Sequence, residues 1–236
     1  MTTPSMLGRL KKSLVSSAGD IVFGMEDGTV SIFGLVFGVA ATTTDNMAVL
    51  IAGAAGACAA AVSMMAGTYL EVETNRDEAR TFAARLKSQI EQNPGEVMDR
   101  VAGELHAAGM TNDQTALVTG FLRSNPALLQ GIATAVTAPA EPGMTQSPLV
   151  QALWMLIADF FSAAIPIVPF ALMPVREGRW VSGSVTMLLL IGLGIGRARI
   201  GQRPVLRTVI ETVAIGVAAA LAGVTIGLGI ASTFGR

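Results

Sequence analysis

The sequence predicts an all-α membrane protein with five transmembrane helices and a small cytosolic helical domain between the second and the third. The chain of 236 residues is 51% hydrophobic and only 14% charged, whereas soluble domains carry roughly 25% charged residues. Five long stretches are almost free of charge, and each approaches the roughly 20 apolar residues that a helix needs to cross a bilayer. No alternation typical of strands competes with this interpretation.

Charged or polar residues separate the five predicted spans from one another. In chain order they lie near residues 20–43, 47–70, 149–173, 179–197 and 207–232. They divide the chain into a cytosolic tail at 1–18, two spans within 19–70, a cytosolic domain with its linker at 71–148, three spans within 149–232 and a tail at 233–236.

The basic residues predict the orientation. Most of the 16 lie in the N-terminal tail, in 71–148 and in the connection after the fourth span, which holds Arg197, Arg199, Arg203 and Arg207. The positive-inside rule assigns these segments to the cytosol. We therefore expect a cytoplasmic N-terminus and an outside C-terminus.

The cytosolic segment 71–148 has the apolar spacing and the boundary signals of four helices. The expected boundaries are Asn93-Pro94 with Glu96 in a capping box, Gly109, Thr111 with Gln114 in a second capping box, and Asn125-Pro126. Weak metal candidates in this segment are Glu71, Glu73, Asp77, Glu78, Glu104 and His106. Such residues are more often a solvated helix face than a metal site.

Several classes of function are excluded by composition. A net charge of −1 offers no basic field for nucleic acid. The single Cys58 and the single His106 exclude a disulfide framework, a cysteine zinc site and a multi-histidine site within one chain. No nucleophile–base pair and no cofactor loop is recognisable, so we expect no enzyme and no permanently bound cofactor.

Acidic residues inside the predicted spans are the main functional candidates, because a charge in lipid is costly and seldom kept without a role. Asp27 lies about 12 Å into the first span, and Met64 lies about 9 Å from the cytoplasmic end of the second, by helical rise. The two residues can therefore share a level in the bilayer. Carboxylate oxygen with thioether sulfur suits a first-row divalent metal.

Three further acids leave alternatives open. Asp159 lies about 15 Å into the third span, where it could hold a proton or a metal, or only donate a hydrogen bond to a carbonyl freed by Pro166. Glu26 could carry a proton or face the lipid headgroups. Glu211 is expected near the interface, paired with Arg207, and Met64 could serve packing alone.

Three segments of the chain resemble the vacuolar iron transporter family. They are DIVFGMEDGTVSIFGLVFGVA at 20–40, AVSMMAGTYL at 61–70 and SPLVQALWMLIADFFSAAIPIVPF at 147–170. The resemblance covers 18–232. The EDG form of the first segment is also similar to the membrane part of bacterial proteins that fuse this domain to a ferritin-like one, so we expect a bacterial cytoplasmic membrane.

The resemblance implies proton-coupled export of Fe2+, and often Mn2+, by a homodimer whose path lies between the subunits. The family's first-span aspartate falls on Asp27 and its second-span methionine on Met64. Its second-span glutamate falls on Gly56, which has no side chain to bind a metal. Asp159 could replace that lost carboxylate.

The cytosolic ligands that the resemblance implies are missing from this chain. The family's glutamates fall on Leu86, Gln89, Val97 and Arg100, and its methionine pair falls near Ala133 and Thr134. We therefore expect this domain to be mainly structural or to bind metal weakly. The same losses leave two other functions open, namely transport of another cargo and a non-transporting membrane protein that senses metal or anchors partners.

Overall fold

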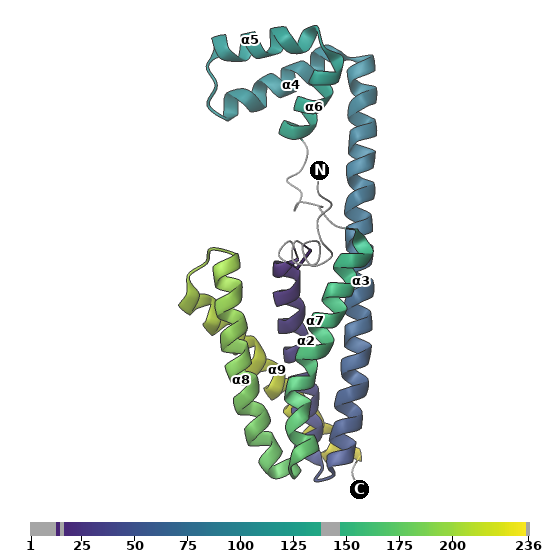
Figure 1. Ribbon diagram of the computed structural model, residues 1–236, viewed down its shortest axis with the longest axis vertical. Coiled ribbons are helices and arrows are strands. Elements are labelled where there is room, and N and C mark those ends of the chain that lie inside the picture. The colour runs from purple at the N-terminus through teal and green to yellow at the C-terminus, as the bar shows by residue number, and fades with distance from the viewer. Residues whose placement is uncertain (1–12, 15–16, 138–146, 235–236) are drawn as a thin grey trace, which may run out of the picture. The chain divides into compact units, whose positions relative to one another are not determined.

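The structure is a computed structural model, and it describes residues 13–14, 17–137 and 147–234. Every regular element in these ranges is a helix, which confirms the all-α class (Figure 1). The helices are α2 (Ala18–Thr42), α3 (Asn46–Gln92), α4 (Pro94–Ala107), α5 (Asn112–Arg123), α6 (Pro126–Thr137), α7 (Pro148–Leu172), α8 (Val175–Ile200) and α9 (Val205–Phe234).

The chain divides into two compact units. The membrane unit comprises residues 1–70 and 145–236, and the connecting unit comprises 71–144. Helix α3 begins in the first and ends in the second, and its 47 residues form one helix without a break at residue 70. The change of composition at that residue is therefore not a helix end.

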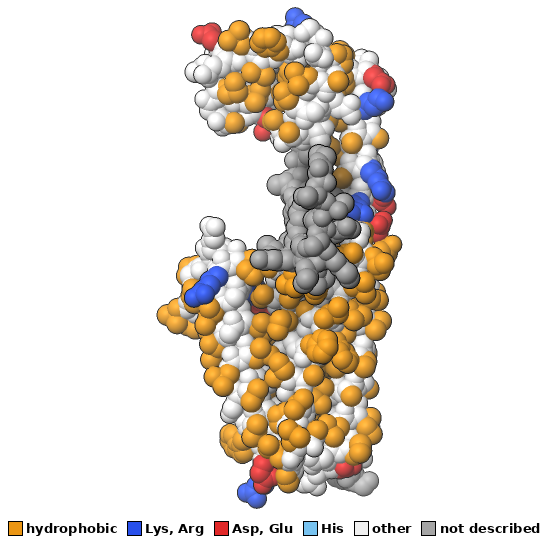
Figure 2. All heavy atoms as spheres, viewed as in Figure 1, with side chains coloured by type: hydrophobic (Ala, Val, Ile, Leu, Met, Phe, Trp, Pro, Cys, Tyr) orange, Lys and Arg blue, Asp and Glu red, His pale blue; other side chains and the backbone are white. Residues whose placement is uncertain are grey.

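Five helices are long and apolar enough to cross a membrane: α2, α3, α7, α8 and α9. This confirms the five predicted spans. Large apolar side chains cover their outer surfaces, including Trp180, Leu188 and Leu206, which are 81%, 70% and 74% exposed. On the face shown in Figure 2, hydrophobic side chains cover most of the membrane unit and charged ones lie near its ends. Such a surface fits a lipid environment.

Helix α2 is the centre of the membrane unit, and it runs parallel to both α7 and α9. Toward α7, Asp20, Gly24 and Gly28 meet Gln151, Met155 and Asp159 at successive turns. Toward α9, Gly34 and Gly38 lie so close to the backbone of the facing helix that a Cβ atom on Gly38 would come within 2.6 Å of the Gly223 carbonyl oxygen. Small residues allow this close packing in lipid.

The paired prolines of α7 do not interrupt the helix, which runs unbroken past Pro166 and Pro169. The Ser182 hydroxyl of α8 donates to the Pro166 carbonyl oxygen at 2.7 Å. At the end of α7, the Asn46 amide donates to the carbonyl oxygens of Phe170 and Met173, each at 2.6 Å, and accepts from the Val175 N–H at 3.2 Å. These bonds hold α3, α7 and α8 together where backbone groups would otherwise lack partners.

The connecting unit contains a small apolar core between the last turns of α3 and the helices α4, α5 and α6. Its buried members include Leu86, Val97, Val101, Leu129 and Ala133. A core of this kind needs no bound metal to bring its helices together.

Most of the boundaries expected in the connecting unit are confirmed. Thr111 and Gln114 form a reciprocal capping box, α6 begins at Pro126, and Gly109, with φ of +99°, follows the end of α4. The capping box at Asn93 is wrong. Asn93 stands at the N-cap position, but its side chain donates to Glu96 Oε2 at 3.2 Å and accepts no backbone N–H. The expected linker at 138–148 lies largely outside the described residues.

Candidate functional site

Asp159 is the most unusual polar residue of the membrane unit. Its side chain is 0% exposed, and neither carboxylate oxygen has a hydrogen-bond partner among the described residues. A Cβ atom on Gly28 of α2 would come within 2.6 Å of Asp159 Oδ1, so only glycine at 28 leaves room for this carboxylate. Buried polar groups are almost always hydrogen-bonded, so this exception marks Asp159 as a candidate functional residue. The structural alternative of a hydrogen bond to a carbonyl freed by Pro166 is not observed.

Asp27 lies on α2 next to the glycine that faces Asp159. Its side chain is half-buried, and a Cβ atom on the adjacent Gly28 would come within 2.6 Å of Asp159 Oδ1. The two acids therefore lie at about the same level of the α2–α7 interface, one enclosed and the other partly open. Two like charges in a place with little water favour a bound proton or cation between them.

Hydroxyl groups lie near this pair. Ser162 Oγ donates to the Asp159 carbonyl oxygen at 2.9 Å, and a Cβ atom on Gly28 would come within 2.9 Å of that hydroxyl oxygen. The bond between Ser182 and Pro166 sets the antiparallel register of α7 and α8, which brings Thr186 to the level of Ser162. The Thr186 hydroxyl is also buried without a partner among the described residues.

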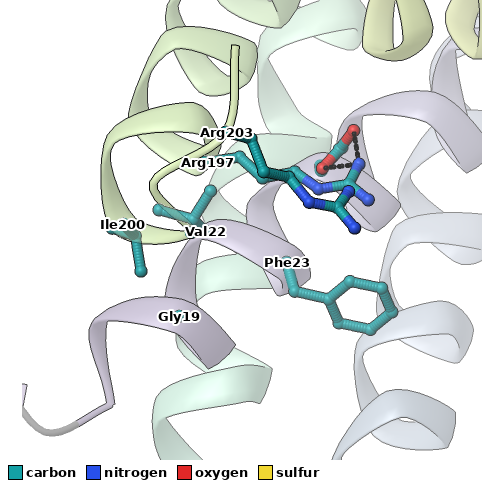
Figure 3. A pocket seen from close by; sticks show the side chains of 8 residues that line it. Gly19, Val22, Phe23, Arg197, Ile200 and Arg203 are labelled. Carbon is teal, nitrogen blue, oxygen red and sulfur yellow. Dashed lines mark hydrogen bonds and ion pairs between the residues drawn. The ribbon is translucent and has the colours of Figure 1, made fainter. Parts of the chain in front are cut away.

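Glu26 lies on a different side of α2 and is engaged in an ion pair. Arg197 Nη1 donates to Glu26 Oε1 at 3.1 Å and to Oε2 at 3.3 Å, and the Thr212 hydroxyl donates to Oε1 at 2.7 Å. Figure 3 shows the pair as dashed lines. Glu26 is only 7% exposed, so it does not face lipid headgroups. It ties α2 to α8 and α9.

Arg197 lies at the expected end of the fourth span, where it was counted with the basic residues of the following connection. Helix α8 continues to Ile200 and carries Arg197 in its last turn. Its guanidinium group reaches inward because the buried Glu26 carboxylate offers an opposite charge. The expected surface pair of Arg207 and Glu211 is confirmed, with Nε and Oε1 2.9 Å apart.

Gly56 does not lie where Asp159 could simply replace a carboxylate. A Cβ atom on Gly56 would meet the ends of Leu35 and Ile32 of α2, at 3.0 and 3.3 Å. Ile32 lies one helical turn, or about 6 Å, from Gly28. Along α2, Asp159 therefore lies about one turn away from the level of Gly56, in the direction of Asp27. Met64 is half-buried on α3, and its pairing with Asp27 stays a prediction.

The acids predicted as weak candidates in the connecting unit do not gather into a site. Glu71, Asp77, Glu78, Glu104 and His106 are exposed, and Glu73 is half-buried. Asp77 pairs with Arg80 at 3.1 Å, and His106 Nδ1 lies 2.7 Å from the Met110 carbonyl oxygen. Among the described residues, no three His, Cys, Asp or Glu side chains are placed to hold a metal ion.

The positions that would carry the family's cytosolic ligands do come together, but with other chemistry. Leu86, Val97 and Ala133 belong to the apolar core of the connecting unit, with exposures of 2%, 1% and 0%. Beside them, Arg100 Nη2 donates to Gln89 Oε1 at 3.4 Å. These positions thus stabilise packing and offer no carboxylate.

Sequence reasoning missed the partners of the membrane acids. The role of Arg197 had one usable signal, since a basic residue in the last turn of a span can reach a buried acid about a turn away in depth. Thr212 and Thr186 carried no signal, because threonine is common in membrane helices and its partners depend on which helices are neighbours.

Comparisons with known proteins identify the family of this chain. The model of the VIT family matches residues 18–228. The chain is 27% identical over 216 residues to a vacuolar iron transporter of Centaurea cyanus, covering 91% of this chain and 88% of that protein. It is 28% identical over 205 residues to vacuolar iron transporter 1 of Arabidopsis thaliana, covering 86% and 82%. The match extends over four spans, the connecting unit and most of the fifth span, so the chain belongs to the VIT family, whose members are transporters and not enzymes.

Proposed function

We propose that this protein exports a divalent metal ion, Fe2+ or Mn2+, from the cytosol in exchange for protons, and that it works as a homodimer. The observation that carries the proposal is the pair of Asp27 and Asp159, because Asp159 is fully buried and its oxygens lack partners. The names of the relatives, all vacuolar iron transporters, support iron as a cargo.

Asp27 is the residue that meets the metal in this proposal. It is half-buried, so an ion can reach it from a path along the surface of α2. One carboxylate cannot replace the hydration shell of a divalent ion. Met64 and the same two residues of a second subunit would complete the ligand set, and oxygen with sulfur ligands favours a first-row metal over calcium or magnesium.

Asp159 lies behind Asp27 and supplies the proton in exchange. With no metal present, two neighbouring carboxyl groups in a dry interface favour a bound proton. A divalent cation at Asp27 replaces that proton because its positive charge favours both carboxylates in their ionised form. Asp159 can also act as an accessory ligand. The hydroxyl groups of Ser162 and Thr186 can donate a hydrogen bond to an ionised carboxylate or accept one from a protonated carboxyl group.

Glu26 takes a different role from Asp159. Its carboxylate is already held by Arg197 and Thr212, so it could accept a proton or a metal only after release from that ion pair. We therefore assign proton exchange first to Asp159 and expect Glu26 to hold α2, α8 and α9 in place.

The proposed setting is a bacterial cytoplasmic membrane, with the N-terminus and the connecting unit in the cytosol. The arginines of the connection after α8 support this orientation. The connecting unit is proposed to be structural, since its core occupies the positions of the family's ligands. The metal is cargo, and no permanently bound cofactor and no nucleic acid take part.

Flux in proteoliposomes tests the proposal. Uptake of Fe2+ or Mn2+ by vesicles with the purified chain should rise when the vesicle interior is more acidic than the outside, because protons then leave as the metal enters. Competition by Co2+ and Zn2+ would rank the possible cargo ions. Asp27→Asn keeps an oxygen but removes the charge, so it should stop the flux. Equal flux in empty vesicles and in vesicles with the chain would favour a non-transporting role, and flux of Zn2+ alone would favour another cargo.

A further inference from the structure

A cavity of about 250 Å³ opens where the beginning of α2 meets the end of α8. It has two kinds of wall. Arg197, Arg203 and the paired Glu26 line one part, and Val22, Phe23 and Ile200 line the other (Figure 3). Phe23 and Ile200 are 55% and 51% exposed, so the apolar wall continues onto the outer surface of the membrane unit.

Arg203 is placed at this cavity by the tight connection between α8 and α9. The Gly201 N–H donates to the Arg197 carbonyl oxygen at 2.9 Å, and the Arg203 N–H donates to the Ala198 carbonyl oxygen at 2.9 Å. Gln202 between them has φ of +50°, a left-handed conformation that turns the chain back over the last turn of α8. The side chains of Arg197 and Arg203 consequently point into the same cavity (Figure 3).

The charges at the cavity do not cancel. Arg197 is matched by Glu26 at 3.1 Å, whereas Arg203 forms no ion pair with any of the described residues. One guanidinium group is thus left over beside an apolar wall at the end of a membrane helix. A guanidinium group presents several N–H donors in a fork that fits phosphate oxygens.

We propose that this cavity binds a phosphate group, with Arg203 as its main contact. The group comes from a phospholipid, whose acyl chains would follow the wall formed by Val22, Phe23 and Ile200, or from free phosphate. Basic pockets between transmembrane helices are known to hold anionic lipid headgroups. The site is separate from Asp27 and Asp159 and does not depend on the proposed transport.

Binding to the purified, delipidated full chain tests this site, with native mass spectrometry as the readout. The probes are phosphatidylglycerol, the matching diacylglycerol without phosphate, and inorganic phosphate as a competitor. Arg203→Gln should weaken phosphatidylglycerol binding about tenfold, since a hydrogen bond to a charged group is worth that much or more. Arg203→Lys keeps the charge but loses the fork of N–H donors, so it should bind more weakly than the unchanged chain and more tightly than Arg203→Gln.

Arg199→Gln is the matched control, because Arg199 is an exposed arginine of the same helix end and does not line the cavity. It should bind phosphatidylglycerol like the unchanged chain. Displacement of the lipid by millimolar inorganic phosphate would show that the site takes phosphate from either source, and no displacement would assign it to the lipid. Equal binding by the unchanged chain and Arg203→Gln, or equal binding of diacylglycerol, would overturn the proposal.

Discussion

The membrane unit and the connecting unit differ in the side chains that they bury at the positions relevant to metal binding. At the α2–α7 interface the membrane unit keeps Asp159 fully buried, with no hydrogen-bond partner for either oxygen. In the connecting unit, the positions where the family's metal ligands would fall hold Leu86, Val97 and Ala133, which pack in an apolar core. The first arrangement costs stability and the second adds to it.

This difference indicates where metal chemistry is retained. An unpartnered buried polar group costs about 1–3 kcal/mol, so it persists where it has a function. An apolar core has no such cost and no capacity to bind a cation. We infer that this chain handles its cargo in the membrane unit and uses the connecting unit for its architecture.

The largest effect is expected from Asp27→Ala. This change removes the only half-open carboxylate of the pair, so metal flux into proteoliposomes should fall to the level of empty vesicles. The elution volume in size-exclusion chromatography should stay the same, since a half-buried side chain contributes little to assembly. Flux at the level of the unchanged chain would remove Asp27 from the transport path.

Leu86→Ala tests the connecting unit in the same terms. Leu86 is 2% exposed, and deleting such a side chain in a core typically costs about 2–5 kcal/mol. Urea denaturation, followed by a fluorophore on the connecting unit, should show that loss. Leu117→Ala is the control, because Leu117 is 66% exposed and should change the unfolding midpoint little. Equal stability of both variants would contradict the assignment of this core.

Glu26→Gln sharpens the distinction between the two kinds of buried acid. The change leaves Arg197 without its carboxylate, and we expect a loss of about 2 kcal/mol, less than for a fully buried pair because Arg197 is partly exposed. Thermal unfolding in detergent measures it. Glu211→Gln, which breaks a surface pair with Arg207, should cost about 0–1 kcal/mol. A larger loss of stability in Glu211→Gln than in Glu26→Gln would show that the ion pair of Glu26 and Arg197 does not stabilise the fold.

Asp159→Asn is expected to lower flux about tenfold, or ~1.4 kcal/mol, and to remove much of its dependence on the pH gradient. Asparagine keeps the shape and can donate a hydrogen bond, but it cannot release a proton. A pH–flux profile identical to that of the unchanged chain would show that Asp159 has no part in proton exchange.

The matching change Asp159→Leu separates stability from transport. It removes the unpartnered oxygens, so the unfolding temperature should rise even as flux falls. A lower unfolding temperature would mean that the carboxyl group makes stabilising contacts that the apolar side chain cannot replace.

The number and type of spans could be predicted from the sequence because they depend on length and charge within single segments. Helix boundaries at Thr111, Gly109 and Pro126 were equally accessible, since each rests on local backbone chemistry. Asp27 and Asp159 could be singled out as acids in apolar spans. Local signals of this kind survive whatever the neighbours are.

The partners of those residues could not be predicted in the same way. That Asp159 faces Gly28, and Glu26 faces Arg197, depends on α2 packing against α7 on one side and α8 on another. Hydrophobic segments carry little information about which neighbours they choose, because lipid and protein offer similar apolar surroundings. The absence of a capping box at Asn93 has a local cause. The Asn93 side chain donates to Glu96 and accepts no hydrogen bond from a backbone N–H group of the first turn.

Metal binding by the full chain tests whether the cargo ion is held in the membrane unit. Calorimetry measures Mn2+ binding to the purified protein. This binding should be lost in the double variant Asp27→Asn, Asp159→Asn. It should be unchanged when Glu71, Glu73, Glu78 and Glu104 are all replaced by glutamine, because these side chains do not converge on a site. The reverse result, with binding kept by the membrane double variant and lost with the four glutamates, would contradict the account and assign the metal to the connecting unit.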